Sequence, residues 1–184
     1  AIRYDGTAPS EGHGFQLHVG PMGTDVRGRV KIKSADPLEY PSILFNYLST
    51  PNERKEWCEA VRLSRKIIET EAMSELMGKE LSPGLEVQTD EEILDFIAKE
   101  GESAYHPSST CKMGVDPLSV TDASLRVHGV ENLRVVDASV FPYVTNGNIY
   151  SPVMMVAEKA ADLILGKRPL KDEHLPFYKK EMKA

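Results

Sequence analysis

The segment from Ala104 to Gly114 carries the histidine of this sequence that is best placed for acid–base chemistry. His106 stands between Tyr105 and Pro107, in a hydroxyl-rich stretch without the periodicity of a helix or a strand. An imidazole gains and loses a proton near neutral pH, so a loop histidine of this kind suits general acid–base catalysis. A structural alternative stays open, in which the ring only hydrogen-bonds a carbonyl group of its own loop.

A second segment, residues 133–152, combines an apolar strand pattern, a turn-rich loop and a helix start. The strand pattern ends at Asp137, and Ser151 followed by Pro152 indicates the first turn of a helix. Free backbone N–H groups at a helix start attract an anion or the electron-rich edge of a ring. Here too a structural alternative stays open, in which Asp137 only ends the strand and the loop only reverses the chain.

Other site chemistries have weaker support. The sequence contains no G-x-G-x-x-G, P-loop, G-x-S-x-G, H-E-x-x-H or C-x-x-C motif. His106 and Cys111 are two potential metal ligands, but no other histidine stands at ligand spacing from them, so we expect no metal site. Ser108 and the two hydroxyl residues after it lack a nucleophile elbow and suit hydrogen bonds within a loop.

The elements that must position these segments indicate an α+β fold, with a mainly antiparallel sheet and flanking helices. Alternating apolar and polar residues predict strands at 14–22, 27–34 and 42–48. Short loops between half-polar strands favour an antiparallel sheet with one solvated face. Two further strands are expected at 124–130 and 133–137.

Capping patterns predict three helices. Thr50 with Glu53, and Thr89 with Glu92, have the spacing of a capping box, so one helix should run from residue 50 to about 69 and another should start at 89. The third should occupy residues 151–166, because Gly166 is a natural C-cap.

Composition excludes several classes of protein. The chain of 184 residues is 41% apolar and 27% charged, which is ordinary for a globular domain. Its net charge is −6 and its basic residues are scattered, so we expect no nucleic-acid partner. Two cysteines make no disulfide framework. No apolar run approaches the ~18 residues of a membrane-spanning helix.

Together the two segments resemble the carboxyl-terminal part of the glucose–methanol–choline (GMC) family of flavin-dependent oxidoreductases. The family pattern is a His-Pro loop ending in Met-Gly, then Leu-Arg-Val-Val-Asp-Ala-Ser with a Pro, then a loop with Asn or His before a helix. The same order is found here from Tyr105 to Ile164. Four further segments resemble the choline-oxidising branch of the family, namely residues 12–16, 27–30, 41–47 and 145–150.

The resemblance implies a carboxyl-terminal portion of a longer protein, because family members begin with a G-x-G-x-x-G dinucleotide-binding unit that is absent here. Residues 1–124 would form the substrate-binding domain with the catalytic His loop. Residues 125–167 would return to the FAD domain as a strand, loop and helix, and 168–184 would form a tail. The missing amino-terminal domain would complete the FAD site, so FAD is expected to be absent from these residues alone. Apolar surface exposed without that domain would favour self-association.

Six residues receive roles from the resemblance. His106 is implied as the catalytic base near the flavin, and Asn148 as the partner that hydrogen-bonds the alcohol oxygen. Tyr105 would contribute to the pocket for the trimethylammonium group through a cation–π contact. The implied flavin contacts are Asp137, Ala138 and Pro152.

The implied activity is the oxidation of choline to betaine aldehyde, in which a base takes the hydroxyl proton and a hydride passes to flavin N5. A separate electron acceptor, which the sequence does not identify, would reoxidise the flavin. Three alternatives stay open: a family member that oxidises another primary alcohol, a stand-alone choline-binding module without redox chemistry, and a structural domain without a ligand. With no signal peptide or membrane span in this sequence, the expected location is the cytoplasm or the periphery of the inner membrane.

Overall fold

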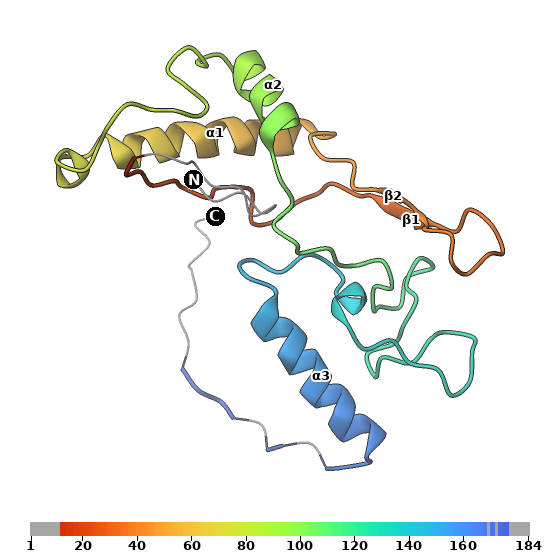
Figure 1. The fold of residues 1–184 in the computed structure, drawn as a ribbon. Coiled ribbons are helices and arrows are strands. Elements are labelled where there is room, and N and C mark those ends of the chain that lie inside the picture. Colours follow the sequence, from red (N-terminus) through yellow and green to blue (C-terminus); the bar gives the residue numbers. More distant parts are fainter. Residues whose placement is uncertain (1–11, 169, 172, 177–184) are drawn as a thin grey trace, which may run out of the picture.

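The computed structural model describes residues 12–168, 170–171 and 173–176, which form an α+β fold with three α-helices and one small sheet. The elements follow in the order β1 (Arg29–Lys31), β2 (Ser42–Leu44), α1 (Pro51–Ile68), η1 (Glu71–Met73), α2 (Asp90–Glu100), η2 (Ala138–Val140) and α3 (Tyr150–Ile164). Residues 1–11 and 177–184, parts of the predicted first domain and tail, lie outside the described residues. Figure 1 shows α1 and α2 on one side of the molecule and α3 on the other.

Helices α1 and α2 begin at the predicted caps. The Thr50 hydroxyl accepts a hydrogen bond from the Glu53 backbone N–H at 3.1 Å, and Pro51 follows at the first helical position. The Thr89 hydroxyl accepts from the Glu92 N–H at 3.2 Å, and the Glu92 carboxylate accepts from the Thr89 N–H at 2.9 Å. Both predicted starts are confirmed, because a cap involves only residues within one turn. The full capping box forms only at α2, since the Glu53 carboxylate accepts from the Leu48 N–H rather than from the Thr50 N–H.

Helix α3 begins at Tyr150, one residue before the predicted start, and ends at Ile164. Gly166, just beyond it, has a φ of 63°. This left-handed conformation favours a residue without a Cβ, so the predicted C-terminal glycine is confirmed. Within the described ranges, no helix combines the length and the apolar character needed to cross a membrane.

Two separate clusters of buried side chains hold the described residues together. The first lies between α1 and α2 and comprises Cys58, Val61, Ile93 and Ile97. The second joins α3 to the segments before it and comprises Leu125, Val140 and Ala160. The second cluster positions the predicted site. Val140 belongs to η2, the short helix that follows Asp137, and Ala160 belongs to α3, the helix that contains Pro152.

The sheet is smaller than predicted. Strands β1 and β2 pair antiparallel over three residues each, with Val30 opposite Ile43. Residues 14–22 form no strand, and residues 124–137 take part only in isolated bridges. The strand predictions for these two segments are wrong for the described structure. The alternation of apolar and polar residues only determines which face of a strand each side chain would lie on. A β-ladder also requires a neighbouring strand that supplies the backbone hydrogen bonds.

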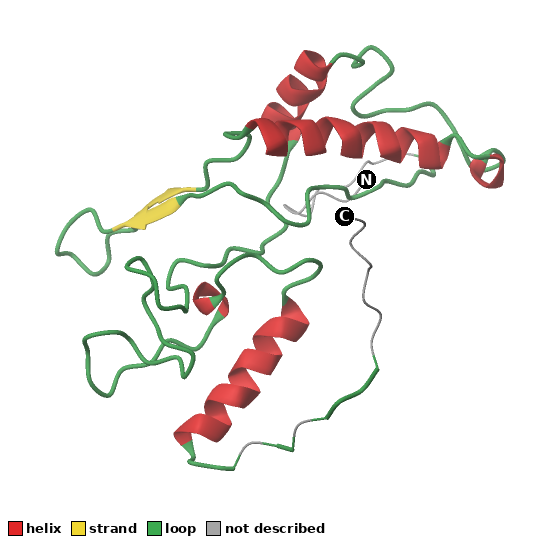
Figure 2. Cartoon of the chain, turned by 180° about the vertical axis from the view of Figure 1, so that it is seen from behind, coloured by secondary structure: helices red, strands yellow, loops and turns green. Residues whose placement is uncertain are grey.

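The apolar side chains of the sheet are not covered by a core. Val30 is 50% exposed, and Ile32, just after β1, is 89% exposed, although alternation predicts an inward face for both. Figure 2 shows that long loops, rather than further strands, occupy the region between the sheet and α3. The α+β class is therefore confirmed, while the described sheet is a minor part of the fold.

Candidate functional site

Backbone hydrogen bonds join the His106 loop to η2. Three backbone N–H groups of this loop donate to the three carbonyl oxygens of η2. Ser109 donates to Ala138 at 3.3 Å, Cys111 to Ser139 at 2.9 Å and Met113 to Val140 at 2.8 Å. The bond from the Ser109 N–H therefore ends at the residue directly after Asp137. The two segments that the sequence points to are therefore brought together, although they lie far apart along the chain.

The loop has an unfavourable backbone conformation on both sides of residues 106–108. Tyr105 has a φ of 57° and Ser109 a φ of 71°. A left-handed conformation costs about 1–2 kcal/mol for a residue that carries a Cβ. The Tyr105 N–H donates to the Ser103 hydroxyl at 3.1 Å, and the bonds to η2 hold Ser109. These contacts maintain a loop shape that local preferences alone do not favour.

His106 is half-buried, and its Nδ1 atom is buried without a hydrogen-bond partner in the described part of the chain. A buried polar atom without a partner costs about 1–3 kcal/mol. In the structural alternative, the ring bonds a carbonyl group of its own loop. The described residues show no such bond at Nδ1.

Asp137 and Ala138 make specific local contacts. The Asp137 carboxylate accepts a hydrogen bond from the Ser139 N–H at 2.7 Å and so caps η2. The Ala138 carbonyl accepts the bond from the His106 loop at 3.3 Å. Asp137 is exposed and Ala138 is half-buried.

The start of α3 places Asn148 and Pro152 within one helical turn. The Asn148 side-chain oxygen accepts a hydrogen bond from the Tyr150 N–H at 3.1 Å. Ile149 is the N-cap and makes no side-chain cap, and Pro152 lies in the first turn. No hydrogen bond within the described residues joins Asn148 to His106.

Neighbouring polar groups support the loop after His106. His128 hydrogen-bonds the Gly114 carbonyl through Nε2 at 3.0 Å, which gives this histidine a structural role. The hydrogen bond from Lys112 holds the pKa of Asp116 well below its usual range, with further donors nearby. The described residues contain no cluster of His, Cys, Asp and Glu suited to a metal ion.

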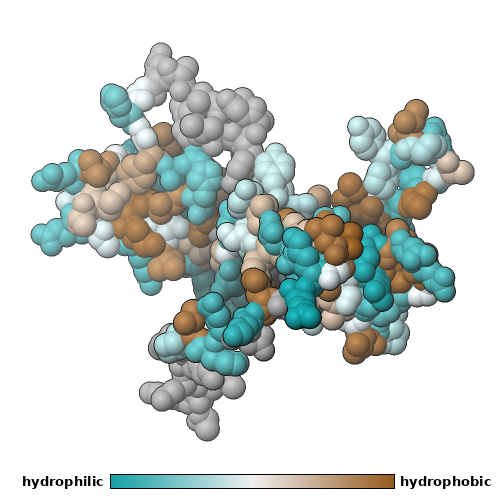
Figure 3. Space-filling view, turned by 90° about the horizontal axis from the view of Figure 1, so that it is seen from below, coloured by the Kyte–Doolittle hydropathy of each residue, from teal (hydrophilic) through white to brown (hydrophobic). Residues whose placement is uncertain are grey.

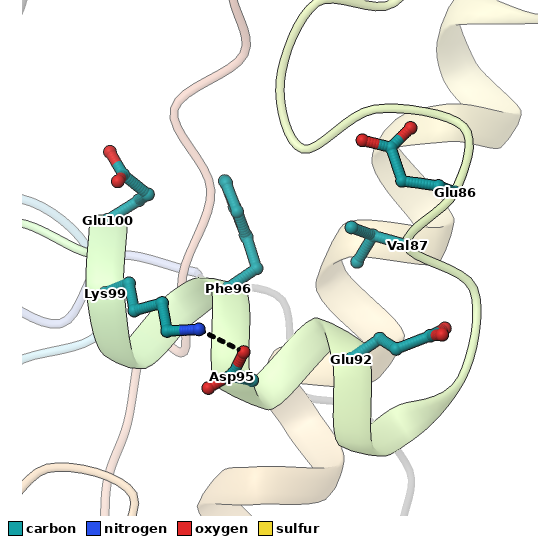
Figure 4. Close-up of a pocket in the computed structure, with 7 residues that line it drawn as sticks. All are labelled: Glu86, Val87, Glu92, Asp95, Phe96, Lys99 and Glu100. Carbon is teal, nitrogen blue, oxygen red and sulfur yellow. Dashed lines mark hydrogen bonds and ion pairs between the residues drawn. The ribbon is translucent and has the colours of Figure 1, made fainter.

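A cavity of about 400 Å³ lies along α2, and none of the six predicted site residues lines it (Figure 4). Two of its four acidic residues are engaged in local contacts, since Glu92 caps α2 and Asp95 accepts from Lys99 at 2.6 Å. The residues that line it are Glu86, Val87, Glu92, Asp95, Phe96, Lys99 and Glu100. It is therefore a feature separate from the predicted site.

Sequence reasoning missed two side chains in the loop before α3. The Thr145 hydroxyl oxygen is buried without a hydrogen-bond partner in the described residues. The Arg27 guanidinium lies over the Tyr143 ring, 5.0 Å from its centroid, in a cation–π contact that ties this loop to the segment before β1. Both features depend on how distant segments meet, which no local pattern encodes.

Sequence comparison gives two findings. A family model described as GMC oxidoreductase matches residues 24–157, a range that contains all six predicted site residues. The oxygen-dependent choline dehydrogenase of Staphylococcus aureus (strain JH9) is 56% identical over 182 residues, which cover 97% of this chain and 32% of the relative. The chain thus spans about a third of the length of this relative.

Solved structures give a consistent result. Pyridoxine 4-oxidase from Mesorbium loti superposes with a TM-score of 0.75 and 34% identity, over 80% of this chain and 29% of that protein. Formate oxidase from Aspergillus oryzae RIB40 superposes with a TM-score of 0.68 and 31% identity, over 76% of this chain and 24% of that protein. Both similarities extend over most of this chain.

Proposed function

The chain belongs to the GMC oxidoreductase family, and we propose that it is the carboxyl-terminal part of an FAD-dependent alcohol oxidoreductase that converts choline to betaine aldehyde. The observation that carries the proposal is its 56% identity, over 97% of its length, to a protein named as a choline dehydrogenase. Because that relative is about three times as long, the proposal assigns the rest of the active site and the dinucleotide-binding unit to residues outside this sequence.

The residues present are compatible with a flavin beside α3. This helix has 15 residues, and its N-cap makes no side-chain cap. A helix start carries about half a positive charge, which suits the pyrimidine edge of a flavin. In the first turn of α3 the Tyr150 N–H is bonded to Asn148 and Pro152 has no N–H, so the Ser151 N–H is the donor left for the ring. In this proposal Ala138 and Pro152 contact the ring, and Asp137 lies beside it. When bound, the flavin supplies the acceptor for the hydride that leaves the alcohol carbon.

His106 is assigned the proton transfer. The hydroxyl of an alcohol is a very weak acid, so its proton leaves readily only when a base accepts it as the C–H bond breaks. The bonds from residues 109–113 to η2 support the assignment, because they fix the backbone of the loop that carries His106 beside Asp137 and Ala138. A base positioned in this way contributes a factor of ~10²–10⁴ to the rate.

Asn148 is assigned the orientation of the alcohol oxygen. An amide cannot act as a base, but its NH₂ group donates hydrogen bonds. Since the Asn148 oxygen already accepts from the Tyr150 N–H, the NH₂ group is the part of this side chain left to bind an alcohol. Holding the reacting oxygen in one position lowers the entropic part of the barrier.

Tyr105 is assigned to the binding of the trimethylammonium group. Its side chain is 65% exposed, so aromatic surface is accessible to a cation. Attraction between a quaternary ammonium and an aromatic face contributes about 0.5–2 kcal/mol, depending on how far water is excluded. Further walls of this pocket would come from residues outside this sequence.

We keep as a proposal the domain division that the resemblance implies, with 1–124 as the substrate-binding part and 125–167 as a strand–loop–helix unit. The buried cluster of Leu125, Val140 and Ala160 supports the packing of α3 against the segment that starts at Leu125, although that segment forms only isolated bridges in the described structure and Met113 of the first part packs against the same cluster. The uncovered side chains of Val30 and Ile32 support a larger antiparallel sheet completed by strands from outside this chain. The tail over 168–184 and a location in the cytoplasm or at the inner membrane stay predictions.

The test compares two alcohols of the same shape on the full-length, flavin-loaded protein. Choline and 3,3-dimethyl-1-butanol differ in having a quaternary nitrogen or a quaternary carbon. Under anaerobic conditions choline should bleach the flavin absorbance faster at equal concentration, by about 2- to 30-fold, because only choline gains the cation–π contact. Asn148→Ala should slow this bleaching, whereas Asn146→Ala, in an exposed position of the same loop, should not.

Each other outcome selects a different function. Equal bleaching by the two alcohols would contradict choline specificity and support another primary alcohol as substrate. Choline binding by a full-length protein that holds no flavin would indicate a binding module. Absence of both choline binding and flavin would indicate a structural domain. Oxygen uptake during turnover would show whether oxygen serves as the electron acceptor, as the name of the staphylococcal relative states for that protein.

A further inference from the structure

The loop between η2 and α3 carries Asn148 but has few hydrogen bonds of its own. Phe141 and Ile149 are buried at its two ends. Among the described residues, no backbone hydrogen bond joins residues 142–148 to another part of the chain, and the Asn148 side chain bonds the nearby Tyr150 N–H. A loop without backbone partners can take several shapes. Contacts made by side chains therefore have to select one of them.

The side chain of Arg27 makes such a contact. Its guanidinium lies over the Tyr143 ring, 5.0 Å from the ring centroid. The Arg27 Nη1 atom also donates hydrogen bonds to the Val26 carbonyl at 2.8 Å and to the Thr24 carbonyl at 3.3 Å. These two bonds hold the guanidinium against its own segment, so it does not have the freedom of a long side chain in solvent.

The segment that carries Arg27 is itself bonded to two other parts of the chain. The Asn46 side chain, in the loop after β2, donates to the Arg27 carbonyl at 3.1 Å. The Thr50 hydroxyl, at the start of α1, donates to the Asp25 carboxylate at 2.7 Å. Arg27 therefore reaches Tyr143 from a backbone that is fixed on both sides.

We propose that Arg27 is a positioning residue, which sets the course of the loop toward Asn148 through its contact with Tyr143. The backbone bonds from residues 109–113 fix η2, and Tyr143 follows η2 after only two residues. One of these two is a proline, whose ring restricts its own φ to about −65°. With η2 and Tyr143 both held, the direction in which the chain continues to Asn148 is held as well.

This inference rests on the proposed role of Asn148, whose NH₂ group has to meet the alcohol oxygen in one position. The contact joins the proposed substrate-binding part, residues 1–124, to the unit over residues 125–167, which carries Asn148. A contact shifts the equilibrium between loop shapes only by its own free energy. For a cation–π contact at an exposed site, that free energy corresponds to a change of about two- to fivefold.

The test uses the full-length, flavin-loaded protein and the variants Arg27→Gln and Tyr143→Leu. Each should lower kcat/KM for choline by about two- to fivefold. The double variant should be no slower than either single one, because both changes remove the same contact. Tyr143→Phe keeps the aromatic face and should retain the unsubstituted value. The matched controls are Arg29→Gln, at an exposed position of β1, and Tyr40→Leu, at an 84% exposed position.

A comparison with Asn148→Ala separates positioning from a general structural role. In the Asn148→Ala protein, Arg27→Gln should cause no further loss of kcat/KM, because no amide remains to be positioned. A contact that only stabilised the fold would act independently of Asn148, and the two losses would then multiply.

A further readout is independent of turnover. In protein labelled with ¹⁵N-arginine, the guanidinium N–H signals of Arg27 are identified by their loss in Arg27→Gln. The ring current of Tyr143 should shift these signals upfield. Tyr143→Leu should abolish the shift, whereas Tyr143→Phe should keep it. The measurement on the unsubstituted protein tests the contact even where Tyr143→Leu does not accumulate.

Arg27 signals without an upfield shift in the unsubstituted protein would overturn the inference. Unchanged kcat/KM in Arg27→Gln, or losses that multiply with those of Asn148→Ala, would do the same. The proposed function fails separately. Unchanged flavin bleaching in Asn148→Ala would contradict the role of Asn148 whatever Arg27 does. Slower bleaching in Asn148→Ala with no effect of Arg27→Gln would contradict only the role of Arg27.

Discussion

Replacing His106 by glutamine removes an imidazole while keeping a polar side chain of similar length. Turnover should fall by about 10²–10⁴-fold, because glutamine cannot accept the alcohol proton. Flavin content, measured by absorbance of the purified full-length protein, should stay at the unsubstituted level. His128→Gln is the matched control, since His128 bonds the Gly114 carbonyl and has no assigned part in the reaction. Turnover close to normal in His106→Gln would contradict the base role.

Glu53 is a buried carboxyl group at the start of α1. Burial is the main cause that raises its pKa above the usual value, and the hydrogen bond from the Leu48 N–H opposes the shift only in part. A carboxyl with a raised folded-state pKa binds its proton more tightly in the folded state. Stability is therefore lost as the pH rises from the unfolded pKa, 4.5, through the folded one.

Glu53→Gln should consequently stabilise the chain at neutral pH, and the difference should vanish below the unfolded pKa, where both states of the unsubstituted chain are protonated. Urea unfolding at several pH values, followed by the fluorescence of Trp57, the one tryptophan of the sequence, measures this. Glu59→Gln, at an exposed position of α1, is the control. A gain in stability that is equal at all pH values would contradict the prediction.

At the scale of the elements, the reciprocal capping box of α2 offers a direct test of local stability. Thr89→Ala removes the hydroxyl that accepts from the Glu92 N–H, and it should cost about 1 kcal/mol of unfolding free energy. Thr89→Ser keeps the hydroxyl and should cost much less. Urea unfolding followed at Trp57 suits this comparison, because Trp57 packs against the α1–α2 cluster. Equal stability of Thr89→Ala and the unsubstituted chain would show that tertiary packing alone holds the start of α2.

The contrast between helices and strands belongs to the same scale. A helix bonds each residue to one four positions away, so the caps at Thr50 and Thr89 suffice to locate α1 and α2. A strand bonds to a neighbour that can lie anywhere in the protein. Residues 14–22 have a strand pattern but no neighbouring strand among the described residues, and they form no regular secondary structure.

At the scale of the whole molecule, the described chain leaves a large amount of apolar surface exposed. Figure 3 shows apolar side chains spread between polar ones over the face seen from below. On α3 alone, Met155 is 72% exposed and Ile164 is 60% exposed. Exposed apolar surface on this scale marks an interaction site or a tendency to associate.

The 184-residue chain studied by itself should therefore self-associate and bind no flavin. Size-exclusion chromatography with light scattering over a range of concentrations should give a mass above 20.4 kDa that rises with concentration. Met155→Lys on α3 should weaken the association. Leu81→Lys, an 84% exposed position outside α3, tests whether α3 is the face involved. A constant monomer mass, or a flavin spectrum from the chain alone, would contradict the prediction.

The sequence by itself determined the features that depend on neighbouring residues or on an extended motif. The helix starts at Thr50 and Thr89 and the glycine after α3 could be predicted because each is decided within one or two helical turns. Family membership could be predicted from the His-Pro loop and the Asp-Ala-Ser segment, whose order and spacing are legible without a structure. The roles of the six candidate residues came with that resemblance and remain to be measured.

Only the tertiary structure decided which atoms are buried and which segments meet. The pairing of residues 109–113 with 138–140, and the unpaired atoms of His106 and Thr145, arise where distant parts of the chain approach each other. The short sheet has the same origin, because a ladder and a covered apolar face both require partners that local alternation cannot supply. Local hydrogen bonds are determined by the types of neighbouring residues. The burial of side chains and the pairing of strands depend on the whole chain and on whatever packs against it.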